Sequence, residues 1–361
     1  MNTELTSLYD FVVIGGGVAG LSAANQLVDL KVNSILVIES GSYPTHKICG
    51  EFLSPECLAT LKTWNIPKPT EISSISFNVL GARFDFNLST SAGGLSHIYL
   101  DPILAERIQR NGINLLTNTQ VVDIQPPSTT SNLFSIHLSN NKIIQARQLI
   151  VATGRLPQFQ EKKLPPKYIG IKSHFEGIKL DCDMEMYSFP KTYIGLSKIE
   201  DEKVNIACLT REMDPDILTS PRLFIDKLCT QNAEFGRKIN QGNMIFPKWM
   251  TSYAPAFGIK QPPSWNNAYF IGDAAAAIPP ACGNGLSMGI LSGCLAAQYA
   301  LRQDPVGFKK EWNKRYQHTF FYGKVLNEAM LNPFFGAAFV KLCSQFPSVP
   351  KYFFRKTRDV S

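Results

Sequence analysis

The stretch "DFVVIGGGVAGLSAANQL", residues 10–27, decides the fold, because it reads as an apolar strand, a glycine turn and a helix in succession. Gly15, Gly17 and Gly20 form the pattern G-x-G-x-x-G. The first glycine permits a tight turn, the second lets a pyrophosphate approach the backbone, and the third lets the helix pack close to the strand. The helix N-terminus offers unpaired N–H groups and a positive dipole end to phosphates. The stretch therefore predicts a Rossmann-type dinucleotide site in an α/β protein.

A second apolar run, "SILVIES", follows the helix and ends in Glu39. An acid at this position accepts a hydrogen bond from a free ribose hydroxyl, which favours FAD or NAD over NADP. Strand, turn, helix, strand and acid occur in the required order, so the signal is stronger than the glycine pattern alone. The alternative is a tight turn in an ordinary α/β protein.

Two stretches far downstream favour FAD. "QLIVATGRLP" reads as a strand that ends at Thr153 and Gly154, where the backbone can approach the dinucleotide a second time. In "FIGDAAAAIPPACGNGLSMGI", Asp273 ends another strand, where it can hold a ribityl hydroxyl or cap a helix. The helix that opens near Gly285 would aim its N–H groups at the N1–C2=O edge of a flavin. Glycines at every fourth position give this helix a smooth face for close packing.

Composition excludes several other classes of protein. The 361 residues suggest two domains, interleaved in sequence, and 44% hydrophobic residues can bury a sizeable core. The net charge of +7 is spread along the chain, which disfavours nucleic acid as a partner. Eight cysteines occur without C-x-x-C or C-x-x-H, so we expect neither a metal site nor a disulfide framework.

The sequence also bears on localisation. The polar start "MNTELTSLYD" predicts no signal peptide. The longest uncharged run, residues 274–301, contains prolines and glycines and makes a poor membrane span. We therefore expect a cytoplasmic protein, with peripheral membrane contact as an option for its C-terminal segment.

The chain resembles the FAD-dependent oxidoreductases of the p-hydroxybenzoate hydroxylase fold, and within them the geranylgeranyl reductase-like branch. The resemblance covers most of residues 9–302. It rests on "VVIGGGVAG…IES", "KICGE", "GLSHIYLDPILAERIQRNGINLLTNTQVVDI", "IVATG", "YIGLSKIEDEKVNIACL" and "FIGDAAAAIPPACGNGLSMGI", which occur in the family's order. The first and last of these motifs are specific for the FAD site, and the others are less specific.

The resemblance and the motifs together imply a set of FAD-binding residues. The backbone near Val121 and Val122 would contact the adenine, Asp273 the ribityl chain, and the segment 285–287 the isoalloxazine. The predicted set is Gly15, Gly17, Val18, Ala19, Gly20, Glu39, Ser40, Lys47, Cys49, Gly50, Val122, Thr153, Gly154, Gly272, Asp273, Pro280, Gly283, Gly285, Leu286 and Ser287.

The chain departs from the family at two positions. His97 stands where the family usually has arginine after "GLS". Thr153 precedes Gly154 where aromatic hydroxylases usually carry an aspartate that serves their handling of the nicotinamide. This second departure points to another route for the electrons, so the external electron donor is open, with NAD(P)H as a candidate. The halogenases of this fold carry W-x-W-x-I-P, which is absent here, so halogenation is disfavoured.

The resemblance and the strand-like runs predict an interleaved domain organisation. A Rossmann-type FAD-binding domain of the GR2 and p-hydroxybenzoate hydroxylase-like type would take residues 1–66, 96–165 and 263–305. A mostly antiparallel sheet from 67–95 and 166–262 would roof the substrate face of the flavin. The remaining residues, 306–361, would form a helical and aromatic C-terminal segment that completes the core, covers an apolar tunnel or touches a membrane.

These features predict an FAD-dependent oxidoreductase that acts on a hydrophobic isoprenoid-, quinone- or polyketide-like molecule. Hydride transfer at a carbon–carbon double bond is the favoured reaction. A monooxygenase that uses a flavin hydroperoxide is the alternative, and a non-catalytic FAD-binding electron carrier is a third reading.

Cys49, within "KICGE", is the candidate catalytic residue. Metal binding by Cys49 is disfavoured, because no other metal-ligating residues lie at a usual spacing from it. A redox disulfide with Cys57 is disfavoured, because the two cysteines are eight residues apart with Pro55 between them, and a helix of that length would hold them about 12 Å apart. By resemblance, the loop lies beside the isoalloxazine, where Cys49 acts as a proton relay or as a compact wall residue.

Overall fold

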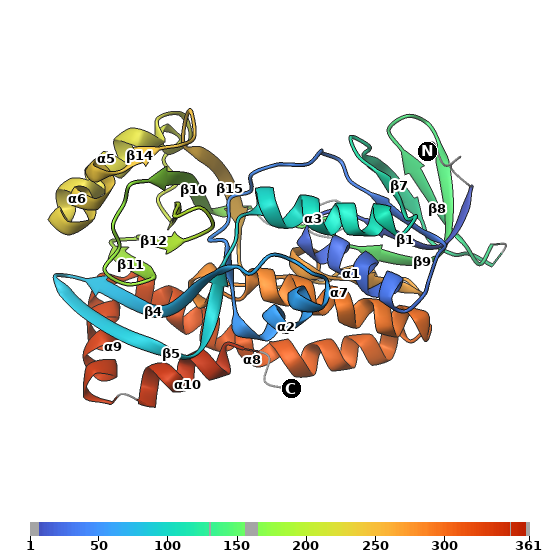
Figure 1. Cartoon of the computed structure of the whole chain (residues 1–361). Coiled ribbons are helices and arrows are strands. Elements are labelled where there is room, and N and C mark those ends of the chain that lie inside the picture. The colour runs from blue at the N-terminus through green and yellow to red at the C-terminus, as the bar shows by residue number, and fades with distance from the viewer. Residues whose placement is uncertain (1–6, 130, 156–164, 347, 359–361) are drawn as a thin grey trace.

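The computed structural model describes residues 7–129, 131–155, 165–346 and 348–358. Figure 1 shows two sheets that lie side by side, with helices from the C-terminal part of the chain running beneath both. Residues 1–6, on which the signal-peptide prediction partly rests, lie outside the described residues.

The first sheet carries the glycine turn at its centre. Over the described residues its order is β6-β2-β1-β9-β8-β7, and β17 also pairs with β9. β6, β2, β1, β9 and β17 are parallel, and β8 and β7 continue the sheet antiparallel. β2 is buried along its whole length, as a parallel sheet covered on both faces requires. The bounds are β1 Leu8–Ile14, β2 Ile35–Ile38, β6 Asn114–Leu116, β7 Val121–Gln125, β8 Phe134–Leu138, β9 Ile143–Val151 and β17 Ala268–Phe270.

Three helices pack together on this sheet: α1 (Val18–Asp29), α3 (His97–Arg110) and α7 (Gly285–Leu301), with α1 in contact with both others. A Cβ built on Gly293 would lie 2.5 Å from the carbonyl oxygen of Ala19. The smooth face predicted for α7 therefore packs directly on the backbone of α1.

The second sheet has the order β14-β10-β13-β12-β11-β4-β5-β3, with β15 paired to β10. The pair β11–β4 is parallel, and the other pairs are antiparallel. The prediction of a mostly antiparallel sheet is confirmed. Its bounds are β3 Phe52–Leu53, β4 Thr70–Val79, β5 Ala82–Gly94, β10 Pro166–Glu176, β11 Met184–Phe189, β12 Thr192–Lys198, β13 Val204–Thr210, β14 Asn243–Met244 and β15 Met250–Pro255.

Short helices complete the second unit. The segment 221–241 forms two helices, α5 (Pro221–Gln231) and α6 (Ala233–Gln241), because the side chain of Asn232 accepts a hydrogen bond from the Phe235 N–H and starts a new helix. The other short elements are α2 Pro55–Thr63, α4 Asp216–Thr219, the 3₁₀ turns η1 Gly272–Ala274 and η2 Pro280–Cys282, and the two-stranded pair of β16 Gly258–Ile259 with β18 Ala276–Ala277.

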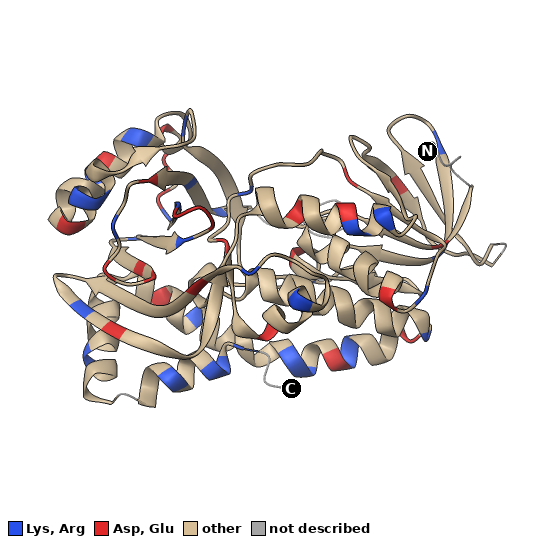
Figure 2. Cartoon of the chain, viewed as in Figure 1, with Lys and Arg blue, Asp and Glu red and all other residues tan. Residues whose placement is uncertain are grey.

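The C-terminal segment is helical, as predicted, and consists of α8 (Pro305–Leu331), α9 (Pro333–Gln345) and α10 (Ser348–Lys356). α8 contacts α7 under the first sheet and β11 and β12 of the second. Among the described residues, no helix combines the length and apolarity that crossing a membrane would need. Figure 2 shows Lys and Arg on many elements, with several along α8 and α10. The three-part domain boundaries stay a prediction.

Candidate active site

The glycine turn joins β1 to α1 and excludes side chains. Gly15 has φ +101°, and a Cβ on it would lie 2.3 Å from the carbonyl oxygen of Ala152. A Cβ on Gly20 would lie 1.9 Å from the carbonyl oxygen of Gly15. Gly17 borders a cavity, and only the Lys47 ammonium comes within 4 Å of its Cβ position, at 3.3 Å. The turn thus presents bare backbone and one cation to the cavity, which suits a pyrophosphate.

Glu39 follows β2 and connects the turn to the cavity. Its carboxylate accepts hydrogen bonds from the N–H groups of Gly16, at 2.6 Å, and Gly41, at 2.8 Å. The side chain also lines the cavity, together with Ser40. Glu39 is therefore held by backbone at the position where a ribose hydroxyl is expected.

The Glu39→Ala variant is expected to bind FAD at least about tenfold more weakly, because hydrogen bonds to a charged group are among the stronger ones. Titration of the apoprotein with FAD, followed by flavin fluorescence, measures the change. Asp123→Ala, an exposed acid on β7, is the matched control. Unchanged affinity in Glu39→Ala would refute the ribose assignment.

The opposite side of the cavity comes from the segment after β17. Gly272 and Asp273 follow this strand, and α7 begins at Gly285, so the N-termini of α1 and α7 reach the same cavity. The Asp273 carboxylate lies 3.7 Å from Nε of Arg155. Burial raises the pKa of Asp273, and the Arg155 guanidinium opposes that shift.

The cavity between these elements measures about 610 Å³, within the range of small-molecule and cofactor sites. It brings together most of the predicted residues. Those that line it are Gly15, Gly17, Val18, Ala19, Glu39, Ser40, Lys47, Cys49, Thr153, Gly154, Gly272, Asp273, Gly285 and Leu286. Bare glycine backbone, two helix N-termini, a cation and two acids fit the phosphates and hydroxyls of FAD.

Six predicted residues lie elsewhere. Gly50, Pro280 and Gly283 line a second cavity beside the first. Gly20 packs against the turn, and Ser287 is buried, with its hydroxyl 2.6 Å from that of Ser54. The Val122 side chain is exposed, and Thr119, Gln120 and Val121 line the cavity in its place.

Several wall residues were not predicted. Arg155 lies just after the predicted Thr153-Gly154 turn, where its side chain also donates to the carbonyl oxygen of Ile48 at 3.2 Å. Residues 250–252 belong to β15 of the second sheet and line the cavity, although they are distant in sequence from its other walls. No local pattern marks them, because their role depends on how the two sheets meet.

Cys49 lines both cavities, and its sulfur accepts a hydrogen bond from the Glu51 N–H at 3.3 Å and interacts electrostatically with His97. Nδ1 of His97 lies 3.0 Å from Oδ1 of Asp101, and Oδ2 of Asp101 accepts from the Lys47 ammonium at 2.7 Å. Burial would lower the pKa of His97, but the Asp101 carboxylate and the Cys49 sulfur raise it to about 9. Burial would raise the pKa of Cys49, but the hydrogen bond and charge of His97 lower it. Cys49, His97 and Asp101 thus form a series of neighbouring titratable groups that ends at the two cavities.

The thiols of Cys49 and Cys57 are both free. Cys57 is buried on α2 and donates to the carbonyl oxygen of Ser54 at 3.3 Å. In this structure the two thiols make separate contacts, and the absence of a redox pair stays a prediction.

Glu51 ties the Cys49 loop to the second sheet. Its carboxylate is fully buried and accepts from the Lys172 ammonium at 2.5 Å and from the His97 N–H at 3.0 Å, and it lies 2.7 Å from Nε2 of His174. Burial would raise the pKa of Glu51, but the hydrogen bond from His174 and the charge of Lys172 lower it to about 2. The loop is therefore anchored by a charged network inside the protein.

The second cavity measures about 180 Å³ and lies between the first cavity and the second sheet. The two cavities share Ile48, Cys49, Arg155, Asp273, Gly285 and Leu286 as lining residues. Apolar side chains dominate the rest of its wall: Phe52, Met184, Met186, Tyr193, Leu209, Phe257 and Ile278. We call it the ring cavity, because its size suits a single ring.

The loop before α7 is held by the end of α10. The Asn284 amide donates to the carbonyl oxygen of Thr357 at 2.9 Å, and Arg358 donates to the carbonyl oxygen of Cys282 at 2.8 Å. Oδ1 of Asn284 accepts from the Ser54 hydroxyl at 3.0 Å. Distant segments thus fix the loop that begins α7.

No protein-family model matches the chain. Among curated proteins, the ubiquinone hydroxylase UbiM of Neisseria meningitidis is 24% identical, with 82% of this chain and 70% of that protein covered. The menaquinone reductase of Mycolicibacterium smegmatis is 22% identical, with 90% of this chain and 83% of that protein covered.

Solved structures show the same fold. A geranylgeranyl bacteriochlorophyll reductase-like protein from Thermoplasma acidophilum matches with a TM-score of 0.73 and 19% identity, over 90% of this chain and 88% of that one. The flavin-dependent brominase Bmp2 matches with a TM-score of 0.80 and 14% identity, over 97% and 93%. These matches confirm the predicted fold of FAD-dependent oxidoreductases, and the relatives' names bear out the predicted enzyme class.

Proposed function

We propose that this chain is an FAD-dependent oxidoreductase that acts on a hydrophobic quinone with an isoprenoid-like tail. The observation that carries the proposal is the pair of adjoining cavities with one shared wall. The larger cavity has the backbone and charges that fit a dinucleotide, and the ring cavity is lined mostly by apolar side chains. The names of the curated relatives, a ubiquinone hydroxylase and a menaquinone reductase, support a quinone as the substrate.

Reduction of a carbon–carbon double bond is the reaction that the wall residues favour. The residues that line the larger cavity would hold FAD, which, once reduced, would supply a hydride for one carbon of the double bond. The neighbouring carbon then needs a proton, and Cys49 faces both cavities with His97 behind it. The Cys49–His97 pair delivers that proton and regains one through His97 and Asp101, so the double bond gains one hydride and one proton.

Hydroxylation is the second candidate, because one curated relative is named a hydroxylase. The two reactions differ in their need for oxygen. We expect FAD-loaded enzyme, photoreduced without oxygen, to convert a quinone with an unsaturated tail to a product that stays two hydrogens heavier after its ring has been reoxidised to the quinone. If product forms only in air and carries isotopically labelled oxygen, the enzyme is a hydroxylase and the reductase assignment fails.

The electron donor and membrane contact belong to the same proposal. NAD(P)H is the candidate donor. The C-terminal helices expose apolar side chains next to basic ones, which supports a reversible contact with a membrane surface that holds quinones. The exposed apolar residues are Phe321, Phe334, Phe335, Leu342, Phe346 and Tyr352.

A further inference from the structure

The ring cavity has no room for a tail. An apolar cavity of about 150 Å³ holds one benzene ring. At about 180 Å³, the ring cavity takes a quinone ring and little else. If the substrate is a quinone with a tail, as proposed above, most of the tail has to leave the ring cavity.

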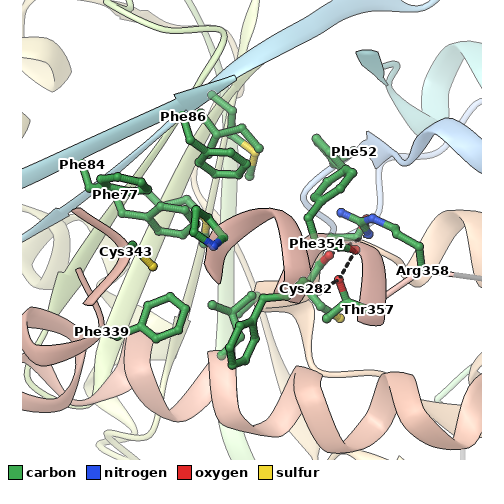
Figure 3. A pocket seen from close by; sticks show the side chains of 18 residues that line it. Phe52, Phe77, Phe84, Phe86, Cys282, Phe339, Cys343, Phe354, Thr357 and Arg358 are labelled. Atoms are coloured by element: carbon green, nitrogen blue, oxygen red, sulfur yellow. Dashed lines mark hydrogen bonds between the residues drawn. The ribbon is translucent and has the colours of Figure 1, made fainter. Parts of the chain in front are cut away.

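A third cavity, of about 60 Å³, adjoins the ring cavity and lies between the second sheet and the C-terminal helices (Figure 3). The two cavities share Phe52, Met184, Met186 and Gly283 as lining residues. We call the third one the tail cavity. Apart from Thr357 and Arg358, its wall is made of apolar and cysteine side chains and one glycine.

Three layers of the fold supply this apolar wall. Phe77, Phe84 and Phe86 come from β4 and β5, and the rings of Phe77 and Phe86 stack with centroids 5.9 Å apart. Phe339 and Cys343 come from α9. Pro350, Phe353 and Phe354 come from α10. Such a wall lacks the hydrogen-bond partners that a polar group would need when buried, and it suits a hydrocarbon.

Phe52 stands between the two cavities. It is 5% exposed, and its ring lies 3.0 Å from the Cβ position of Gly283. The other partition residues, Met184 and Met186, are unbranched and adapt their shape readily. Rotation of the Phe52 side chain, with these methionines adjusting, would join the ring cavity to the tail cavity.

We propose that the tail cavity receives the part of the substrate's hydrocarbon tail that lies beyond the double bond to be reduced, with Phe52 as the gate and α9 and α10 as the cover, so that this double bond stays beside Cys49 in the ring cavity. Arg358 helps to hold the cover in place. Its guanidinium lies 4.2 Å from the ring centroid of Phe354 and 5.8 Å from that of Phe52.

Binding measurements with two quinones test this assignment. The probes are a methyl-substituted benzoquinone without a tail and the same ring with a tail of two isoprene units. Their dissociation constants for the FAD-loaded protein are measured by quenching of flavin fluorescence. The Cys343→Trp variant, which fills the tail cavity, is expected to bind the tailed quinone at least about tenfold more weakly and the tail-less quinone as the wild type does.

The matched control is Leu342→Trp, one residue away on α9, where the side chain is 43% exposed. It should leave both affinities unchanged. A second variant, Phe339→Ala, enlarges the tail cavity. It should strengthen binding of the tailed quinone and leave binding of the tail-less quinone unchanged. This variant tests the tail cavity even if Cys343→Trp fails to retain FAD.

Each result has one meaning. If wild-type protein binds both quinones and neither variant changes the preference for the tail, the tail cavity is refuted and the proposed function stands. If wild-type protein loaded with FAD binds neither quinone, the quinone assignment fails, and the tail cavity fails with it.

Discussion

The Cys49→Ala variant is expected to retain FAD and to turn over about 100- to 10,000-fold more slowly than the wild type, the range that a positioned general acid contributes. The expectation follows from the place of the thiol, which borders both the dinucleotide cavity and the ring cavity. Cys49→Ser should lose activity to a similar extent, because a serine hydroxyl keeps the shape of the thiol but releases its proton far less readily.

The pH profile gives a second readout of the same groups. The Cys49–His97 pair holds a transferable proton until the imidazolium of His97 ionises, and the pKa of His97 is raised to about 9. Turnover should therefore fall as the pH rises through about 9. The pH dependence of Cys49 alkylation in the resting enzyme reports on the ionisation of the Cys49–His97 pair without turnover. In the His97→Gln variant, alkylation of Cys49 should require a higher pH.

Cys229→Ala is the matched control, because this free cysteine on α5 lines none of the described cavities. It should leave turnover and its pH profile unchanged. Full activity in Cys49→Ser would reduce Cys49 to a compact wall residue and remove the proton relay.

The Lys172→Met variant is expected to lose about 3–5 kcal/mol of unfolding free energy, the usual cost of leaving a buried charge without its partner. Glu51 and Lys172 are both fully buried, and the ammonium lies 2.5 Å from the carboxylate. Methionine keeps most of the length of the lysine side chain, so the loss reports on charge more than on volume. Urea unfolding of the FAD-loaded protein measures it.

The double variant with Glu51→Gln should recover part of this loss, since it removes the uncompensated charge. Lys314→Met, in an exposed pair with Glu311, is the control and should change stability little. A Lys172→Met protein as stable as the wild type would show that the network does not anchor the loop.

The same network predicts a pH dependence of stability. The folded-state pKa of Glu51 is about 2, below its ordinary 4.5, so its contribution is complete above pH 4.5 and is lost as the pH falls towards 2. Between pH 4.5 and pH 2, the unfolding free energy should fall less in the double variant Lys172→Met/Glu51→Gln than in the wild type, because the variant has no carboxylate at position 51.

The sequence reveals those parts of the site that depend on local geometry. Gly15, Gly17 and Glu39 were predictable because a strand, a turn and a helix place them within one βαβ unit. Asp273 and Gly285 were predictable for a similar reason, since each marks the end of a strand or the start of a helix. The mostly antiparallel second sheet followed from alternating strand patterns.

Other parts depend on contacts that no local pattern reports. Gln120 and Val121 face the cavity while Val122 is exposed, because the pairing of β7 with β8 shifts register between Val121 and Asp123. The link from Cys49 to His97 joins a loop to the start of α3. The sequence shows that His97 stands where the family usually has arginine, but it does not show that His97 interacts with Cys49.

The hold of α10 on the loop before α7 has a consequence for how the protein is made. Gly15 leaves the ribosome early, whereas the contacts of Thr357 and Arg358 with the loop at residues 282–284 form only after nearly all of the described chain has been synthesised. Chains fold from the N-terminus as they emerge. The nascent chain can therefore build the phosphate turn long before the loop at residues 282–284 is fixed, so FAD capture is expected to wait until Thr357 and Arg358 have emerged.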